Sequence, residues 1–376
     1  MERKIFKVQK DKKATLYIML QFLLCASFAL TSYAFVTFDT PQKSAADFFV
    51  SSLTRKPAES IGALLGAKRE EYTNEETVEP PTYIDYGKRL DEILQNYPDT
   101  DEKSEIPEGC FGISAENISQ QGEVKKILFK NSSGKSLSAQ YIESLADKEY
   151  PVKAKLSKNE PLVLILHTHT TEAYIDEDTY YYNPKKAVAE TRSRNDDENV
   201  IAVGKVVKDV LEGMGIGVLH VTDYHDVYVF NESYSHSYES AKKYLETYPS
   251  IKYVIDLHRD SVIHTNGIKV QPVAEIDGRR AAQVMFVIGS NGNGLKHDNW
   301  EKNLTLAVKL QERLVKEYPD LTRPLNIRSG RFNQQLSTGM LLWEMGSCGN
   351  TLQQAKYSAR LVATEYGKLI LENLSD

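Results

Sequence analysis

From residue 106 onward, short apolar runs alternate with longer segments whose apolar residues recur at helical spacing. Runs that are apolar along their whole length are typical of strands buried on both faces of a parallel sheet. We therefore expect one α/β domain over residues 106–376, with a mostly parallel sheet flanked by helices on both faces. The expected strands are 125–131, 161–167, 216–221, 251–258, 283–290 and 339–347, and the expected helices are 197–215, 237–248, 299–318 and 351–374.

Residues 14–36 form an uncharged apolar segment that follows a basic tail, residues 1–13. The segment is long enough for a helix to cross ~30 Å of hydrocarbon. Because positive flanks stay inside, we expect a cytoplasmic tail, a single-pass anchor in the cell membrane and an extracytoplasmic chain beyond it. A cleaved signal peptide is the main alternative, but the segment is long for one and its cleavage sites are poor. The flanking charge disfavours a buried core helix.

Residues 37–105 have the composition of an extracytoplasmic linker. They are rich in Pro, Glu, Ser and Thr and poor in periodic apolar residues, so they cannot bury enough surface to offset chain entropy. One short helix, residues 86–97, is expected to interrupt the linker.

Charge and cysteine content narrow the class of protein. The formal net charge is -6 with both signs mixed along the chain, and no long basic stripe points to nucleic acid. Three cysteines are too few for a disulfide framework, and Cys25 lies in the apolar segment. Cys110 and Cys348 could pair in an oxidising compartment.

Several expected strands end in, or just before, a side chain that could carry chemistry. His169 and Glu172 follow the strand 161–167 with an H-x-x-E spacing, and His258 ends the strand 251–258. Because ligands gather beyond the carboxyl ends of parallel strands, we expect these groups to meet at one edge of the sheet. Two histidines and a glutamate, with a fourth position left for water, are typical of a catalytic zinc site.

Glu344 lies within the strand 339–347, next to large apolar residues. It is the candidate general base, which would accept a proton from a zinc-activated water and deliver it to a leaving amine. Asp256 is a candidate to orient a histidine ligand. His167 could be a ligand in place of His169 or a group behind the ligands, although the spacing to Glu172 favours His169.

Each of these residues also has a structural interpretation. An H-x-x-E spacing arises by chance, and a histidine at a strand end is more often a hydrogen-bonded core residue. Glu344 could belong to a structural ion pair, because a lone carboxylate is costly to bury. Other hydrolytic schemes are weaker: no G-x-S-x-G elbow is present, and Cys348 lacks a designated base. The remaining histidines, treated as non-ligands, are His220, His225, His236, His264 and His297.

Three sequence blocks and the N-terminal anchor together resemble the stage II sporulation protein P family. The blocks are ILHTHTTEAY, AAQVMFVIGSNG and RSGRFNQQLSTGMLLWEMGSCGNTLQQA, and the similarity spans roughly residues 106–376. The resemblance implies a fold similar to zinc-dependent N-acetylmuramoyl-L-alanine amidases. It also implies an amidase and a cross-link endopeptidase that act on peptidoglycan in septal wall thinning and forespore engulfment. The implied partners are sporulation protein D, a lytic transglycosylase, and sporulation protein M.

The resemblance also assigns candidate roles to residues. His169 stands at the family's first histidine, His258 at the histidine ending a later strand, and Glu344 in the L-x-E-x-G context of the catalytic glutamate. Related amidases place the carboxylate ligand before the first helix, where this chain has Asn195 instead. Glu172 is therefore the better candidate ligand for Zn²⁺, and the fallbacks are Glu198, Asp196 and Asp197.

Two arginines are candidates for substrate binding, and two other functions are compatible with the sequence. Arg328 and Arg331 precede the Glu344 strand and could face the anionic stem peptide, or they could be solvated. A zinc carboxypeptidase acting on wall peptides would also suit an H-x-x-E followed by a distant histidine. A non-catalytic wall-binding scaffold would need the same anchor and no metal.

Overall fold

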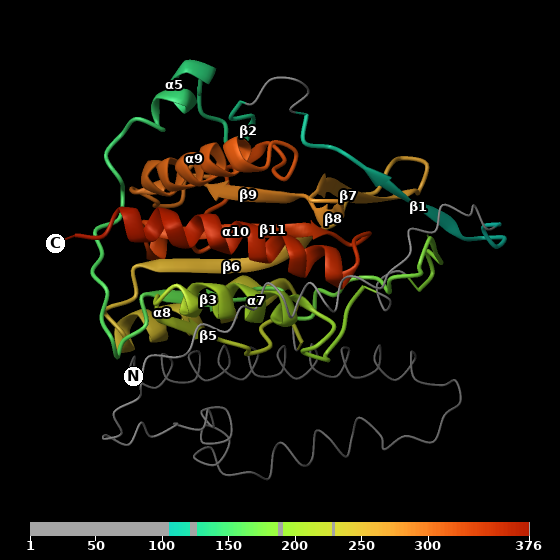
Figure 1. The fold of residues 1–376 in the computed structure, drawn as a ribbon, viewed down its shortest axis with the longest axis horizontal. Helices are drawn as coiled ribbons and strands as arrows, with labels where there is room; N and C mark the ends of the chain where they lie inside the picture. The colour runs from blue at the N-terminus through green and yellow to red at the C-terminus, as the bar shows by residue number, and fades with distance from the viewer. Residues whose placement is uncertain (1–104, 121–125, 187–190, 228–229, 376) are drawn as a thin grey trace, which may run out of the picture. The chain divides into compact units, whose positions relative to one another are not determined.

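The computed structural model describes residues 105–120, 126–186, 191–227 and 230–375 (Figure 1). Its main element is a seven-stranded sheet with the order β2-β10-β9-β11-β6-β3-β5. The strands are, in that order, Phe129–Ser132, Leu325–Arg328, Val284–Gly289, Gly339–Ser347, Tyr253–Asp260, Val163–Leu166 and Val218–His220.

The strands that carry the candidate site are parallel neighbours. Strand β6 lies between β11 and β3 and runs parallel to both. Every other neighbouring pair is also parallel except β11 and β9, which run antiparallel. The prediction of a mostly parallel sheet is therefore confirmed only in part, because β2, β10 and β9 run opposite to the other strands of a mixed sheet.

A second, four-stranded sheet explains this reversal of direction. After β6 the chain enters this sheet, which has the order β4-β1-β7-β8, and it returns as β9 on the far side of β11. The residue pattern did not predict this sheet. An Asp277-Gly278 loop with positive φ at both residues joins β7 to β8, which is a recognised hairpin signal. The strands are Tyr181–Tyr182, Phe111–Glu116, Lys269–Ile276 and Arg279–Ala282.

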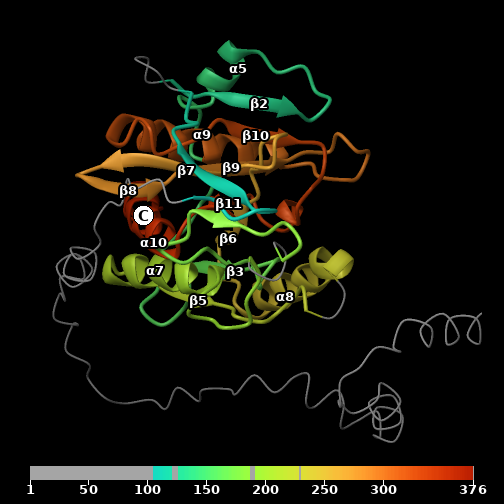
Figure 2. The same cartoon turned by 90° about the vertical axis from the view of Figure 1, so that its right-hand side faces the viewer.

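Helices cover both faces of the seven-stranded sheet. Figure 2 shows α7, α9 and α10 on one side and α8 on the other. Asn199 caps α7, and Thr351 begins α10 with a capping box. The helices are α5 (Ala139–Ser144), α7 (Val200–Gly213), α8 (Ser233–Thr247), α9 (Trp300–Glu317) and α10 (Leu352–Glu372), with short 3₁₀ turns η1 (Phe230–Glu232) and η2 (Gln334–Leu336).

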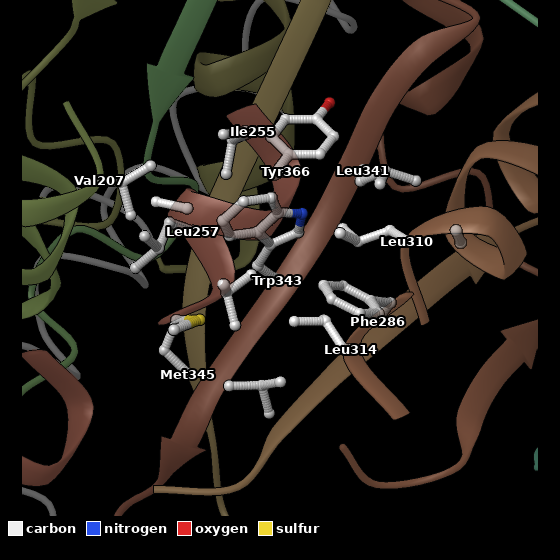
Figure 3. Packing of buried hydrophobic residues seen from close by; sticks show 14 of the residues in the cluster. Val207, Ile255, Leu257, Phe286, Leu310, Leu314, Leu341, Trp343, Met345 and Tyr366 are labelled. Carbon is white, nitrogen blue, oxygen red and sulfur yellow. The ribbon is translucent and has the colours of Figure 1, made fainter. Parts of the chain in front are cut away.

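The larger core lies between the sheet and helices α7, α9 and α10. Trp343 is fully buried at its centre, with ring centroids 5.9 Å from Phe286 and 5.2 Å from Tyr366 (Figure 3). Because side chains alternate along a strand, the residue after Trp343 faces the opposite side, toward α8. That residue is Glu344, and the same alternation turns His258 of β6 toward α8.

Several N-terminal predictions lie outside the described residues. These are the tail 1–13, the anchor 14–36, the helix 86–97 and nearly all of the linker 37–105. Within the part of the chain that is described, no helix combines the length and apolarity needed to cross a membrane. Cys110 and Cys348 are free thiols and do not form the disulfide that an oxidising compartment could allow.

Candidate metal and catalytic site

A tight turn after β3 brings His169 and Glu172 together. The backbone N–H of Glu172 donates to the carbonyl oxygen of His169 over 3.0 Å, which closes the turn across the H-x-x-E spacing. The carbonyl oxygen of Glu172 then accepts from the N–H of Val200, the first residue of α7. Glu172 is therefore positioned by the end of β3 and by the start of α7.

His258 lies between two buried carboxylates. Its Nδ1 is 3.4 Å from Oε2 of Glu172, and its Nε2 is 3.0 Å from Oδ1 of Asp256. Within the described residues Nε2 of His258 makes no hydrogen bond, so its contact with Asp256 is one of charge. Asp256 also accepts from the backbone N–H and the hydroxyl of Thr168. Burial opposes the charge on His258, but the two carboxylates outweigh it and raise the pKa of His258 well above its usual value.

The donor set fits zinc in its chemistry and in two of its distances. Two donors on one tetrahedral zinc lie about 3.4 Å apart, and two bound imidazoles have ring centres about 5 Å apart. The His258–Glu172 contact is 3.4 Å, and the rings of His169 and His258 have centroids 5.4 Å apart at 83°. Among the described residues, no three His, Cys, Asp or Glu side chains are already arranged to hold an ion.

Arg192 contacts Glu172 on the side away from His258 Nδ1, through Oε1, and is itself paired with Asp226. The residue pattern did not predict either residue as part of the site. Arg192 Nη1 donates to Asp226 over 2.9 Å, and its Nη2 lies 3.7 Å from Oε1 of Glu172. The backbone N–H of Arg259 donates to Oε2 of Glu172 over 3.1 Å. Burial disfavours the charged form, but His258 and Arg259 outweigh it and lower the pKa of Glu172 to about 2. The carboxylate is therefore ionised at neutral pH.

Glu344 lies beside His258 on the neighbouring strand. The two residues are paired in the parallel register of β11 and β6, so their side chains point to the same face of the sheet. Oε2 of Glu344 is buried, and no group among the described residues is its hydrogen-bond partner. Burial and the nearby charge of Asp260 raise the pKa of Glu344 to about 8. A carboxyl group with such a pKa can take up and release a proton near neutral pH.

His167 lies on the other face of the sheet and does not join the candidate ligands. Its Nδ1 contacts the carbonyl oxygen of Leu257 at 2.9 Å, so this nitrogen carries the proton. Its Nε2 must then accept from Nε2–H of His220, 2.8 Å away, next to Gly204 of α7. The structure therefore does not bring His167 together with His169, Glu172 and His258, because strand alternation turns it toward α7.

The fallback carboxylates and one arginine lie away from the histidines. Glu198, Asp196 and Asp197 are exposed, and Glu198 accepts hydrogen bonds from Ser193 and Asn195. Arg331 donates to the carbonyl oxygen of Lys296 and so points toward that loop.

Tyr234 and the loop that contacts it form the remaining border of the site. Tyr234 is near the start of α8, and its ring packs against His169, His258 and Phe332. Phe332 and Asn333 both have positive φ, 50° and 57°, which is uncommon for residues other than glycine and costs about 1–2 kcal/mol each. Arg328 ends β10, and its positive charge acts to lower the pKa of Tyr234.

Comparison with known proteins identifies the family of the chain. The model of the stage II sporulation protein P family matches residues 69–365, which include every residue of the candidate site. The chain belongs to this family. A curated family member, stage II sporulation protein P of Bacillus subtilis (strain 168), is 30% identical over 219 residues, or 55% of this chain. The chain matches only about half of that relative, 51% of its length.

Two solved amidases also align with this member of the stage II sporulation protein P family. The CwlD amidase from Clostridioides difficile, in complex with the GerS lipoprotein, aligns at 10% identity and a TM-score of 0.34, over 56% of this chain and 98% of that one. The N-acetylmuramoyl-L-alanine amidase AmiC2 of Nostoc punctiforme aligns at 13% identity and a TM-score of 0.31, over 57% and 98%. TM-scores this low do not establish a shared fold, so no activity follows from them.

Proposed function

We propose that this chain is a zinc-dependent peptidoglycan hydrolase, an N-acetylmuramoyl-L-alanine amidase with endopeptidase activity on cross-links. The observation that supports this most is the 3.4 Å contact of His258 with Glu172, beside His169 and Glu344. Family membership favours peptidoglycan as the substrate.

In this proposal His169, Glu172 and His258 hold the ion. Bound zinc would polarise the scissile carbonyl group and lower the pKa of a water molecule at the site. Asp256 fixes the orientation of His258, and Arg192 fixes that of Glu172. Glu344 takes the proton of the attacking water and gives it to the departing amine.

The biological setting is part of the same proposal. The chain acts in septal wall thinning and forespore engulfment, anchored by residues 14–36 with its catalytic domain outside the cell membrane. Its partners are sporulation protein D and sporulation protein M. Arg328 contacts the anionic stem peptide from the side of Tyr234.

Glu344→Gln tests the assignment because it preserves the side-chain shape and removes the proton acceptor. We expect the full-length variant to release no stem peptides from purified sacculi while zinc stays bound. Glu275→Gln, at an exposed position of β7, is the matched control and should cut normally. Normal cleavage by Glu344→Gln would refute the role of Glu344.

Product analysis separates the alternatives. Mass spectrometry of the digest should show free stem peptides for an amidase, and cleaved cross-links for an endopeptidase. Release of terminal residues alone would indicate a zinc carboxypeptidase, and no product with no bound zinc would indicate a wall-binding scaffold.

A further inference from the structure

We propose that Tyr234 is a further catalytic residue, whose hydroxyl group donates a hydrogen bond to the carbonyl oxygen of the scissile amide. The inference rests on the proposed amidase function and adds to it a donor that the residue pattern did not reveal.

The ring of Tyr234 borders both candidate histidine ligands. Its centroid lies 5.6 Å from that of His169, with the planes at 87°, and 6.5 Å from that of His258, with the planes at 17°. Tyr234 therefore stands edge-on to one imidazole and stacked with the other. A substrate carbonyl group placed between these imidazoles would lie next to the tyrosine.

A strained loop fixes Tyr234 in this position. Asn333 Nδ2 donates to the carbonyl oxygen of Tyr234 over 2.8 Å and to the hydroxyl oxygen of Ser237 over 3.0 Å. Phe332 packs edge-on against the tyrosine ring, with centroids 5.8 Å apart at 65°. Both loop residues have left-handed backbone conformations, and such outliers persist where the surrounding structure holds them for a function.

The same loop is connected to the histidine site through buried hydrogen bonds. Thr168 and Ser237 are bonded through their hydroxyl groups over 2.7 Å, and Thr168 also donates to Asp256. Asp256 is the carboxylate that contacts His258. The positions of Tyr234 and His258 are therefore set by one network that extends from the loop to β6.

The hydroxyl group of Tyr234 is protonated near neutral pH, because an ordinary phenol has a pKa of about 10. Its side chain is half-buried beside His169 and His258. A phenol that stays protonated is a donor throughout the neutral range. Arg328, which ends β10, adds a positive charge near Tyr234.

A donor at this position would stabilise the negative charge that develops on the carbonyl oxygen, in addition to a bound ion. When water adds to the carbonyl carbon, its oxygen forms the new C–O bond, one proton passes to Glu344, and the π pair moves onto the carbonyl oxygen. The Tyr234 hydroxyl group donates to that oxygen without transferring its proton. The pair then returns to re-form C=O, the C–N bond breaks, and the nitrogen takes the proton from Glu344. The products are a carboxylic acid and an amine.

Tyr234→Phe tests the proposal because it removes only the hydroxyl group. Removal of one such donor lowers kcat by ~10²–10³-fold in other enzymes, so we expect a fall of that size on soluble disaccharide-peptide fragments of peptidoglycan. We expect KM and zinc content to stay unchanged. Tyr248→Phe, at the other end of α8, is the control and should retain the wild-type kcat.

Several outcomes would overturn the proposal. A Tyr234→Phe kcat within twofold of wild type would leave only a packing role, and Tyr234→Ala would then be the first variant to lose activity. A raised KM with unchanged kcat would indicate ground-state binding instead of catalysis. If the wild-type protein releases no stem peptide while it binds zinc, the amidase function fails and the role of Tyr234 fails with it.

Discussion

Nδ1 of His258 and Oε2 of Glu172 lie 3.4 Å apart, although one belongs to β6 and the other to the turn after β3. The distance is longer than an ordinary hydrogen bond and equals the spacing expected of two donors on one zinc ion. The pair is buried, and Asp256 and Arg192 support it from either side.

Removal of a candidate ligand should remove the metal. We expect the full-length protein to bind about one zinc per chain, and His169→Ala, His258→Ala or Glu172→Gln to lower the affinity by more than ~100-fold. His167→Asn should leave the zinc content unchanged, because His167 faces α7. Plasma mass spectrometry after dialysis against a chelator measures both results. Full zinc content in His258→Ala would show that the ion, if present, sits elsewhere.

Loss of the Arg192 contact with Glu172 should lower the affinity for zinc without abolishing binding. Arg192→Gln removes the cation that joins Glu172 to Asp226, and changes of this kind typically cost ~10–100-fold in metal affinity. Arg194→Gln, at an exposed neighbouring position, should have no effect. Competition with a fluorescent zinc chelator gives the dissociation constants. Equal zinc dissociation constants for Arg192→Gln and Arg194→Gln would mean that Arg192 does not position the Glu172 carboxylate.

The His167–His220 pair should make the fold sensitive to mild acid. Burial lowers the pKa of His220 to about 4, so between its ordinary value near 6.5 and pH 4 the unfolded chain binds more protons than the folded chain. Stability should therefore be fully present above pH 6.5 and fall by on the order of a few kcal/mol as the pH drops to 4.

Urea denaturation at pH 7 and pH 5 measures this loss of stability. His220→Gln keeps an N–H donor but cannot titrate, so it should show a smaller drop between the two values. His264→Gln, at an exposed position, should keep the drop seen in the wild-type protein. An unchanged drop in His220→Gln would exclude His220 as its source.

Helix α7 lies so close to His167 and His220 that an alanine at position 204 should destabilise the fold. A Cβ there would lie 2.7 Å from Nε2 of His220 and 2.9 Å from Nε2 of His167. Overpacking of this kind costs about 1–3 kcal/mol, so Gly204→Ala should lower the free energy of unfolding by that amount. Gly213→Ala, at the end of α7, would meet no atom of the described part of the chain within 4 Å and should be neutral or up to ~1 kcal/mol more stable. Equal stabilities, measured by thermal unfolding, would contradict the crowding at Gly204.

Local pattern predicted much of the main sheet and parts of the site. The apolar runs placed β3, β6, β9 and β11 to within a few residues, because a strand buried on both faces must be apolar along its length. The sequence did not predict the second sheet, because β7 contains the polar residues Lys269 and Gln271, which are buried in the structure. Period and hydrophobicity cannot distinguish such a strand from a loop.

The sequence alone determined the α/β class, the membership in the sporulation family and the short-range geometry of His169 and Glu172, since a turn of this spacing depends only on neighbouring residues. Tertiary structure decided the antiparallel entry of β9, the turning of His167 away from the site, and the arrival of Arg192 and Tyr234 beside it. These outcomes depend on strand order and on which face each side chain occupies. Strand order and side-chain facing are set by contacts between segments far apart in the chain, and a short stretch of sequence does not contain both partners of such a contact.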